Sequence, residues 1–197
     1  MGEVVANADL QPAEYFFEGL GRQNMSFEHA IAELIDNAIA ASTLPTEIDV
    51  SIDDIGDGNT EVRISDQGHG MSLNTLETHA LKPGAKPLSA HRLNEHGFGL
   101  KNALCSLTKN ERRFKILTRD EQAYSSGHFH TVTGPFRVPL AIEREDASEW
   151  PSGASPGPGT VVTAVTPMVV SHSWWKFGKH ILSLDASFVN LAHAAAS

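Results

Sequence analysis

Cysteine is almost absent from the sequence, because Cys105 is the only one among 197 residues. A single cysteine cannot form an intrachain disulfide, and it cannot supply the thiolate cluster of a structural zinc site. This scarcity is typical of a reducing compartment, so we expect a cytoplasmic protein, or a nuclear one in a eukaryote. Cys105 falls on the apolar side of an expected helix, and we interpret it as a core residue rather than a nucleophile.

Long apolar runs and basic charge are also scarce. No stretch reaches the roughly 20 apolar residues of a membrane-spanning helix, and the first ten residues lack the basic cluster of a signal peptide. The chain carries 15 Lys and Arg against 24 Asp and Glu, a formal net charge of −9. This balance argues against a nucleic-acid-binding surface across the whole domain, although it leaves room for a local basic patch. We expect no membrane partner, and the charge does not support DNA contact.

The composition is that of a globular protein, with 41% hydrophobic and 20% charged residues. We expect an N-terminal arm and short helix over residues 1–21, a main domain over residues 22–170 and a C-terminal helix over residues 171–197. A polar, proline-containing stretch within residues 77–98 predicts a mobile loop, which we interpret as a lid.

One amphipathic helix is predicted over residues 27–42, because apolar residues recur there at i, i+3, i+4 and i+7. Ser26 is a suitable N-cap. Glu33 and Asn37 lie one turn apart on a single face of this helix, with Asp36 beside them. An acid and an amide that project together from an otherwise apolar helix require partners, because buried polar groups are costly without them.

A second polar cluster follows a predicted β-hairpin. Apolar residues alternate over residues 48–52 and 62–64, and residues 56–59 carry the turn signal between them. The second strand runs directly into Asp66-Gln67-Gly68-His69-Gly70-Met71. Two glycines two residues apart indicate that the backbone either bends sharply or is closely approached there. A helix over residues 73–81 is expected to follow.

The third cluster is a glycine-rich loop, Glu95-His96-Gly97-Phe98-Gly99-Leu100-Lys101, which opens a predicted helix through about Leu107. Free backbone N–H groups at such a helix start form an anion site, and Lys101 adds a cation. The motif of P-loop NTPases, G-x-x-x-x-G-K-[ST], is absent from the sequence, so a P-loop enzyme is disfavoured. The three clusters together offer a base, oxygen ligands and a phosphate cradle, which are the parts that Mg²⁺–nucleotide chemistry needs.

Further strands are predicted over residues 114–118, 123–132, 136–142 and 159–166, and the acidic residues 143–149 are interpreted as a solvated loop. Helices and strands are mixed along the chain, with consecutive strands late in it. That order favours an α+β two-layer sandwich over a doubly wound parallel sheet.

Three motifs, in order, resemble the signature boxes of the GHKL ATPases, the superfamily of DNA gyrase B, heat-shock 90 chaperones, histidine kinases and MutL. They are Glu33-Leu34-Ile35-Asp36-Asn37-Ala38, Asp66-Gln67-Gly68-His69-Gly70-Met71 and Gly97-Phe98-Gly99-Leu100-Lys101. The resemblance covers about residues 22–167 and implies the Bergerat fold, with helices on one face of a mixed, mostly antiparallel sheet. The helix around Glu33 and the lysine directly after Gly-Phe-Gly-Leu are most similar to the MORC (microrchidia) ATPases.

By this resemblance the substrate is ATP and the cofactor is Mg²⁺. Glu33 would be the general base that orients or deprotonates the attacking water, and Asn37 would coordinate Mg²⁺ through its side-chain oxygen. Lys101 would pair with the terminal phosphates. Backbone donors to the phosphates would come from Gly97, Phe98, Gly99 and Leu100.

The resemblance also implies a pocket for the base. Asp66 would accept a hydrogen bond from the exocyclic amine of adenine, which would select ATP over GTP. Gly68 and Gly70 belong to the same turn, where Gly70 would allow close approach of the base or of a bridging water. Met71 would pack on the adenine face, and Thr160 would hydrogen-bond near the base.

We therefore expect ATP binding with slow, Mg-dependent hydrolysis that drives lid closure and an ATP-dependent homodimer, with other domains or protein partners involved. Ala40 stands where many relatives have an acid, so one polar contact near the nucleotide is either missing or replaced by another. No transducer domain with its catalytic lysine fits before Ser197, so the chain is either a fragment or works without that domain. The alternative function is a regulatory module that binds ATP without turnover. A histidine-kinase activity is disfavoured, because Glu33 replaces the usual Asn.

Each cluster also has a purely structural interpretation. Glu33, Asn37 and Lys101 would then be solvated surface residues, and the turn after Asp66 would be an ordinary one. The sequence also places two histidines, His128 and His130, on one face of a predicted strand. No cysteine or carboxylate completes a metal site with them in the sequence, which favours a structural or surface role.

Overall fold

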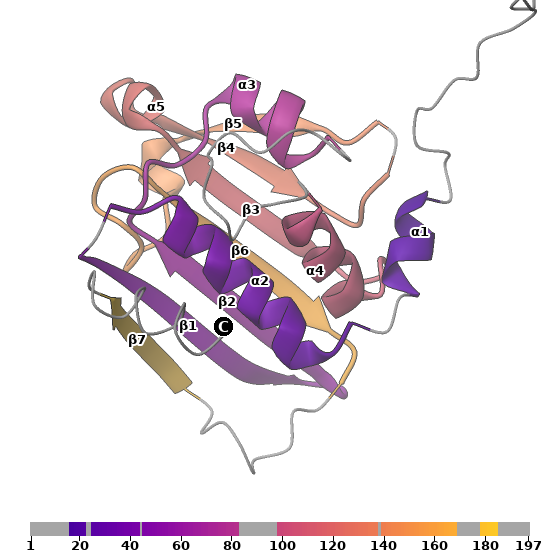
Figure 1. Ribbon diagram of the computed structural model, residues 1–197. Helices are drawn as coiled ribbons and strands as arrows, with labels where there is room; N and C mark the ends of the chain where they lie inside the picture. The colour runs from indigo at the N-terminus through magenta and orange to yellow at the C-terminus, as the bar shows by residue number, and fades with distance from the viewer. Residues whose placement is uncertain are drawn as a thin grey trace, which may run out of the picture.

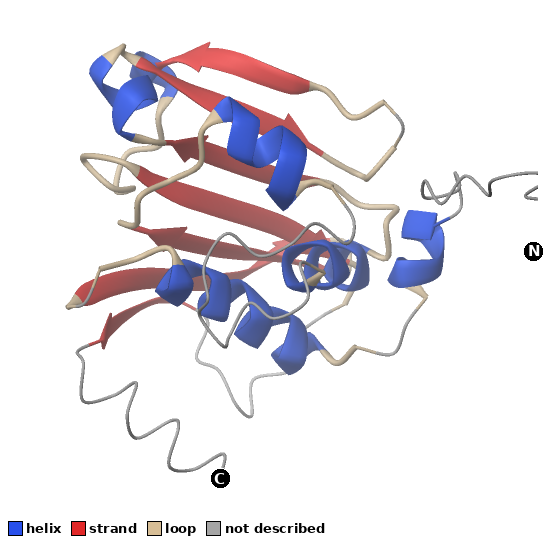
Figure 2. Ribbon diagram, turned by 45° about the horizontal axis from the view of Figure 1, so that its top comes forward, coloured by secondary structure: helices blue, strands red, loops and turns tan. Residues whose placement is uncertain are grey.

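The structure is a computed structural model that describes residues 16–22, 25–43, 45–82, 98–137, 139–168 and 178–184. Seven strands form one sheet in the order β5-β4-β3-β6-β2-β1-β7. Helices cover one face of this sheet, as Figure 1 and Figure 2 show. The predicted α+β sandwich is therefore confirmed. The sheet was expected to be mixed and mostly antiparallel, and every pairing between the described strands is antiparallel.

The central hairpin forms where the alternating residues predict it. Its strands are β1 (Thr46–Gly56) and β2 (Asn59–Asp66), and every second residue in the first half of β1 is buried. Strand β6 (Gly159–Thr166) lies antiparallel beside β2, with Ser65 opposite Val161. This register brings the end of β2 next to the start of β6, because antiparallel neighbours run in opposite directions.

Two helices make up most of the covering layer. They are α2 (Phe27–Ala40) and α4 (Gly99–Thr108), which pack beside each other on the sheet in Figure 1. The Ser26 side chain caps α2 by accepting a hydrogen bond from the backbone N–H of His29 at 3.2 Å. Cys105 of α4 is fully buried, which confirms its interpretation as a core residue.

Shorter helices surround this layer. Helix α1 (Phe16–Gly21) lies within the expected N-terminal helix, and its Phe17 ring stacks on Phe136 with centroids 4.8 Å apart. The helix predicted over residues 73–81 consists of α3 (Leu73–Thr75) followed by a π-helix, η1 (Leu76–Ala80). The expected lid at 77–98 therefore begins in η1, and its residues 83–97 lie outside the described part of the chain.

The next strands along the chain differ in part from the predicted ones. Strand β3 (Phe114–Arg119) forms as expected. The strand expected over residues 123–132 begins later, because its first residues belong to helix α5 (Glu121–Ser125). Asp120 starts this helix by accepting a hydrogen bond from the N–H of Ala123 at 2.9 Å. The remaining elements are β4 (His128–Thr133), β5 (Ile142–Asp146) and the 3₁₀-helix η3 (Ala147–Glu149).

Strand β5 occupies the acidic stretch that was expected to be a loop, instead of residues 136–142. It is one of the two edge strands of the sheet, and all of its side chains are exposed or half-buried. Charged side chains are tolerated at such a position because one side of an edge strand faces water. The charge of residues 143–149 therefore marked exposure rather than a loop.

The C-terminal helix expected over residues 171–197 is wrong where the structure describes this segment. Residues Gly178–Leu184 form strand β7, which pairs with β1 in antiparallel register. Pairing satisfies the backbone hydrogen-bonding groups that β1 would otherwise expose along residues 46–52 of its edge. A short apolar run fits a helix or a strand equally well by periodicity, and here the open edge of β1 decides.

Candidate functional site

The first wall of the site is the side of α2 that meets the start of α4. Glu33 and Asn37 lie one turn apart there, and both are half-buried. The Asn37 side-chain Nδ2 donates a hydrogen bond to the carbonyl oxygen of Glu33 at 2.6 Å. This bond uses the amide nitrogen, so the side-chain oxygen Oδ1 is the atom left for a ligand. An oxygen is the ligand type that Mg²⁺ prefers.

Glu33 meets the start of α4 directly. A Cβ placed on Gly99 would overlap the Oε2 atom of Glu33, and it would lie 3.8 Å from the Asn37 Nδ2 atom. Only a glycine at position 99 therefore leaves room for this carboxylate in its observed position. Glu33 of the first sequence motif and Gly99 of the third, more than sixty residues apart in the chain, are thereby joined in one site.

The first turn of α4 carries backbone amides that no residue of the same helix can accept from. Its N-cap residue, Phe98, makes no side-chain capping bond, and the first N–H bonded within the helix is that of Asn102, to the Phe98 carbonyl at 2.8 Å. The amides of Gly99, Leu100 and Lys101 belong to the first turn, where no helical acceptor is available. They form a cradle that favours an anion. Gly97, the other predicted donor, lies outside the described residues.

The carboxylates on α2 influence one another. Burial raises the pKa of Asp36, and the nearby negative charge of Glu33 raises it further. Both effects disfavour a second charged carboxylate on this face. A cation beside Glu33 would relieve this repulsion.

Asp66 forms the second wall, at the end of β2. Its side chain is only 5% exposed. Its Oδ1 atom accepts hydrogen bonds from the backbone N–H groups of Gly68, at 2.9 Å, and of Thr160, at 3.2 Å. Both bonds end on Oδ1, which leaves Oδ2 as the oxygen available to a donor on a ligand. Burial raises the pKa of Asp66 to about 6, against the opposing effect of these two bonds.

The two glycines of this turn are required by the protein's own backbone. A Cβ on Gly68 would lie 2.5 Å from the carbonyl oxygen of Ala41, the residue that follows α2. The N–H of His69 donates a hydrogen bond to that same oxygen at 2.9 Å. Gly70 has φ +64°, and a Cβ there would overlap the carbonyl oxygen of Arg119. The expected approach of the base or of a bridging water to Gly70 stays a prediction, and within the chain the atom that approaches Gly70 is the carbonyl oxygen of Arg119 in β3.

A threonine that was not predicted connects the residues around Asp66. Thr118 is completely buried, and its hydroxyl accepts a hydrogen bond from the N–H of Met71 at 2.8 Å. The same hydroxyl lies 3.1 Å from that of Thr160, with which it also shares a hydrogen bond. Thr118 stands opposite Thr160 in the ladder between β3 and β6. Only this register identifies Thr118, and no local motif in the sequence carries it.

Lys101 is not the solvated lysine of the structural interpretation. It is only 2% exposed, and its Nζ donates to the carbonyl oxygen of Ala80 at 2.8 Å and to that of His79 at 3.4 Å. These carbonyls lie at the end of η1. Burial lowers the pKa of Lys101 to about 8, because a charged ammonium is costly in an apolar environment.

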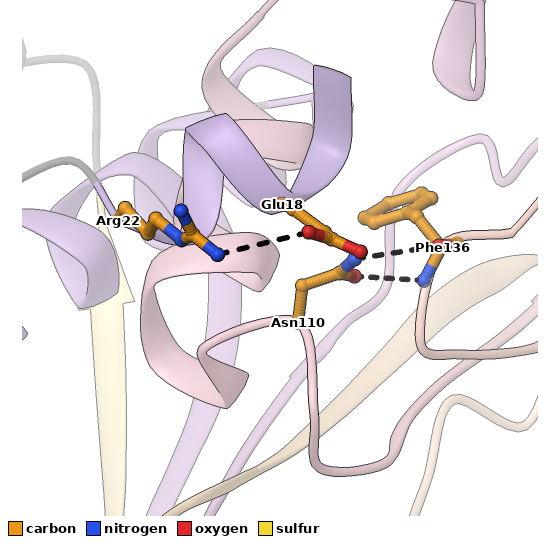
Figure 3. A network of polar contacts seen from close by, with 4 residues as sticks. All are labelled: Glu18, Arg22, Asn110 and Phe136. Carbon is orange, nitrogen blue, oxygen red and sulfur yellow. Dashed lines mark hydrogen bonds and ion pairs between the residues drawn. The ribbon is translucent and has the colours of Figure 1, made fainter. Parts of the chain in front are cut away.

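Other polar groups lie outside this site. The rings of His128 and His130 are 5.4 Å apart, yet the described residues contain no group of three or more potential metal ligands. A separate open cavity of about 1040 Å³ lies at the opposite end of α4, beside α1. Figure 3 shows its polar wall, where Asn110 and Phe136 exchange hydrogen bonds of 2.9 and 3.4 Å. These bonds attach the loop before β5 to the end of α4.

Among the described residues, no helix has both the length and the apolar composition to cross a bilayer. In comparisons with known proteins, a family model described as "Histidine kinase-, DNA gyrase B-, and HSP90-like ATPase" matches residues 25–133. No match was found among curated proteins. The matched region begins just before α2 and ends with β4, so it contains all the elements that meet around Glu33 and most of those around Asp66.

Proposed function

Because the chain belongs to the family of histidine kinase-, DNA gyrase B- and HSP90-like ATPases, we propose that this site binds Mg–ATP and hydrolyses it slowly. The observation that carries the proposal is the contact between Glu33 and the start of α4. It puts a carboxylate beside the backbone cradle for an anion, where a water attacking a terminal phosphate would stand. A general base must lie within reach of the proton that it accepts.

In the proposed reaction, Glu33 orients a water molecule and accepts its proton as the oxygen attacks the terminal phosphorus. The bond between that phosphorus and the bridging oxygen breaks, and ADP leaves with the electron pair. The amides of Gly99 and Leu100, with Phe98 and Gly97 before them, stabilise the phosphate charge. Asn37 would hold Mg²⁺ through Oδ1, and the ion would neutralise phosphate oxygens when bound.

The adenine base of ATP is proposed to lie against the turn at Asp66. The Oδ2 atom of Asp66 would accept a hydrogen bond from the exocyclic amine of adenine, whereas guanine presents a carbonyl oxygen at the corresponding position. Thr160 would hydrogen-bond near the base from its place beside Asp66, where its own N–H is already committed. Met71 would pack on the base, because it lies half-buried at the edge of the core. Gly68 and Gly70 hold the turn in this place.

Nucleotide binding is further proposed to drive lid closure and formation of a homodimer. Lys101 supports the coupling, since it lies in the first turn of α4 and binds the end of η1, where the proposed lid of residues 77–98 begins. Phosphates would compete with the Ala80 carbonyl for this ammonium. ATP would then favour one arrangement of η1 over another, which is the differential affinity that a population shift requires.

Within the family, a MORC-type relationship is proposed from the sequence around Glu33 and from the lysine directly after Leu100. The slow rate follows from the residues near the phosphates. Lys101 is held by carbonyls of η1, and Ala40 offers no polar group one turn from Asn37. The alternative is a regulatory module that binds ATP and does not turn it over.

The deciding experiment compares phosphate release by the wild type and by Glu33→Ala, with Mg–ATP affinity measured by calorimetry. We expect both proteins to bind ATP, and only the wild type to release phosphate above background. Equal turnover would remove the ATPase proposal and leave the binding module. Light scattering with a non-hydrolysable ATP analogue tests the dimer, and an unchanged monomer mass would rule that part out.

A further inference from the structure

Arg119, the last residue of β3, is a buried cation that the proposed reaction does not use. It is 5% exposed. Its Nε atom donates to the carbonyl oxygen of Gly157 and its Nη2 atom to that of Ser155, each at 3.0 Å. The guanidinium carbon lies 4.2 Å from the centre of the Trp150 ring and 4.9 Å from that of Tyr124. The planar group is therefore fixed both in its plane and across its faces.

The carbonyls that Arg119 holds belong to the loop that leads into β6. The Trp150 Nε1 atom donates to the same Ser155 carbonyl at 3.0 Å, and the Ser155 hydroxyl donates to the carbonyl of Pro158 at 2.6 Å. Two residues later comes Thr160, whose N–H binds Asp66. Arg119 thus holds the loop just before the place where the Thr160 amide, the second of β6, meets Asp66.

The backbone of the same strand end supports the other side of Asp66. The Arg119 carbonyl packs against Gly70, and the preceding residue, Thr118, binds the N–H of Met71 and the hydroxyl of Thr160. One dipeptide therefore contacts both the Asp66–Met71 turn and the start of β6. These are the two segments that donate hydrogen bonds to Oδ1 of Asp66.

We propose that Arg119 is a positioning residue that sets how strongly the site selects adenine, by fixing the direction of the Asp66 carboxylate. This inference rests on the proposed role of Asp66 in binding the base. Arg119 does not touch the nucleotide. It holds residues 155–158 so that Thr160 binds Oδ1, and Oδ2 is then aimed at the exocyclic amine.

A purely structural role would have a different signature. Loosening the loop of residues 155–158 would then lower the stability of the protein, or weaken the binding of every nucleoside triphosphate to the same extent. A positioning role instead lowers the part of the affinity that depends on the exocyclic amine. That part is the ratio of the dissociation constants of purine riboside triphosphate, which lacks the amine, and ATP.

The test measures this ratio by calorimetry with Mg²⁺ for the full chain, for Arg119→Gln and for Asp66→Asn. Arg112→Gln is the matched control, because Arg112 is exposed in the loop after α4. We expect the preference for ATP to be about three- to ten-fold lower in Arg119→Gln than in the wild type. A change of this size corresponds to the net contribution of one hydrogen bond to binding. Affinity for purine riboside triphosphate should stay within about two-fold, and Arg112→Gln should leave the ratio unchanged.

Two further variants keep the proposal testable if Arg119→Gln does not fold. Arg119→Lys keeps the charge but cannot bridge both carbonyls, and Trp150→Leu removes the stacked ring and its bond to Ser155. Both should lower the ratio, each by less than Arg119→Gln. Thermal melts establish that each variant is folded at the temperature of the measurement.

The outcomes separate this inference from the function on which it rests. If Asp66→Asn lowers the ratio and none of the folded Arg119 and Trp150 variants does, the positioning role of Arg119 is wrong. The assignment of Asp66 to the adenine amine then survives. If the wild type does not prefer ATP, or Asp66→Asn leaves the preference intact, the assignment of Asp66 to the adenine amine is wrong, and so is the inference about Arg119. A reduced ratio in Arg119→Gln with normal binding of the amine-free nucleotide supports both.

Discussion

The carboxylate of Glu33 lies so close to the backbone of Gly99 that a methyl group on Gly99 would overlap Oε2. The atom that would have to move is the end of a flexible side chain, whereas no backbone atom lies as near. A change at Gly99 should therefore displace the proposed base and leave the fold in place. This separation makes position 99 a direct test of the chemistry.

We expect Gly99→Ala to fold and bind ATP, but to release phosphate about ten- to a hundred-fold more slowly, because small displacements of a catalytic group have effects of that size. Steady-state phosphate release measures the effect. Gly19→Ala is the matched control, since no atom lies within 4 Å of a Cβ at that helical glycine. Unchanged turnover in Gly99→Ala would mean that Glu33 does not act from its observed position.

Asp66 should make adenine selection depend on pH. Burial raises its pKa to about 6, so the carboxylate gains a proton as pH falls through that value, and Oδ2 then stops accepting from the amine. We expect the preference for ATP over purine riboside triphosphate to decline between about pH 7 and pH 5. Using the ratio cancels the titration of the phosphates, which both ligands share. In Asp66→Asn the ratio should be low and independent of pH, and a wild-type ratio that stays constant would contradict the assignment.

The same shift predicts the pH dependence of stability. A carboxyl group whose pKa is raised in the folded state binds more protons there than in the unfolded chain between about pH 4 and pH 6. Its contribution is therefore present at low pH and lost as pH rises through about 6. We expect the free energy of unfolding of the wild type, relative to Asp66→Asn, to decrease over this range in urea titrations. An increase would show that the carboxylate is stabilised in its charged form.

Local pattern predicts the elements whose partners lie nearby. The apolar stripe of α2 and the hairpin of β1 and β2 follow from periodicity, and β6 has the bounds that its apolar residues indicate. The prediction failed for β7, because an open edge of β1, more than a hundred residues earlier, determines its pairing. It also failed for β5, whose charges reflect an exposed edge.

The residues of the site also divide into those that a local motif reveals and those whose partners are distant in the sequence. Glu33, Asn37 and Asp66 could be found from short motifs, and the structure brings Glu33 and Asn37 to the start of α4. Thr118 and Arg119 could not be found, since their partners are Met71, Thr160 and the loop 155–158, which only sheet register brings near. The burial of Lys101 was also hidden, because its acceptors come from η1 rather than from a neighbouring turn of its own helix.

Thr118 offers a test of that hidden connection. Thr118→Val keeps the shape but leaves the Met71 N–H without its acceptor, so we expect stability to fall by about 1–3 kcal/mol. ATP affinity should fall several-fold, because Met71 and Thr160 lose their common partner. Thr118→Ser retains the hydroxyl and should restore most of both properties. Loss of stability with unchanged ATP affinity would limit Thr118 to the core.

Lys101 should make stability depend on pH in the alkaline range. Burial lowers its pKa to about 8 from the ordinary 10.5, so the unfolded chain binds more protons than the folded one between these values. Stability attributable to Lys101 therefore rises with pH there. Relative to Lys101→Met, the free energy of unfolding of the wild type should increase by about 1 kcal/mol per pH unit between about pH 8 and pH 9.5. Cys105 titrates higher, because burial raises its pKa to about 12, and it is present in both proteins.

Mg–ATP should reduce this pH dependence. If the ammonium leaves the Ala80 carbonyl and pairs with phosphate oxygens, their negative charge raises the pKa of Lys101 toward its ordinary value. The wild type and Lys101→Met should then differ by an amount that varies little with pH at saturating nucleotide, in urea titrations made with and without ligand. Lys115→Met serves as the control for the loss of a lysine, because that side chain is 45% exposed. A slope that persists with ATP bound would place Lys101 on η1 in both states and exclude it from the phosphate site.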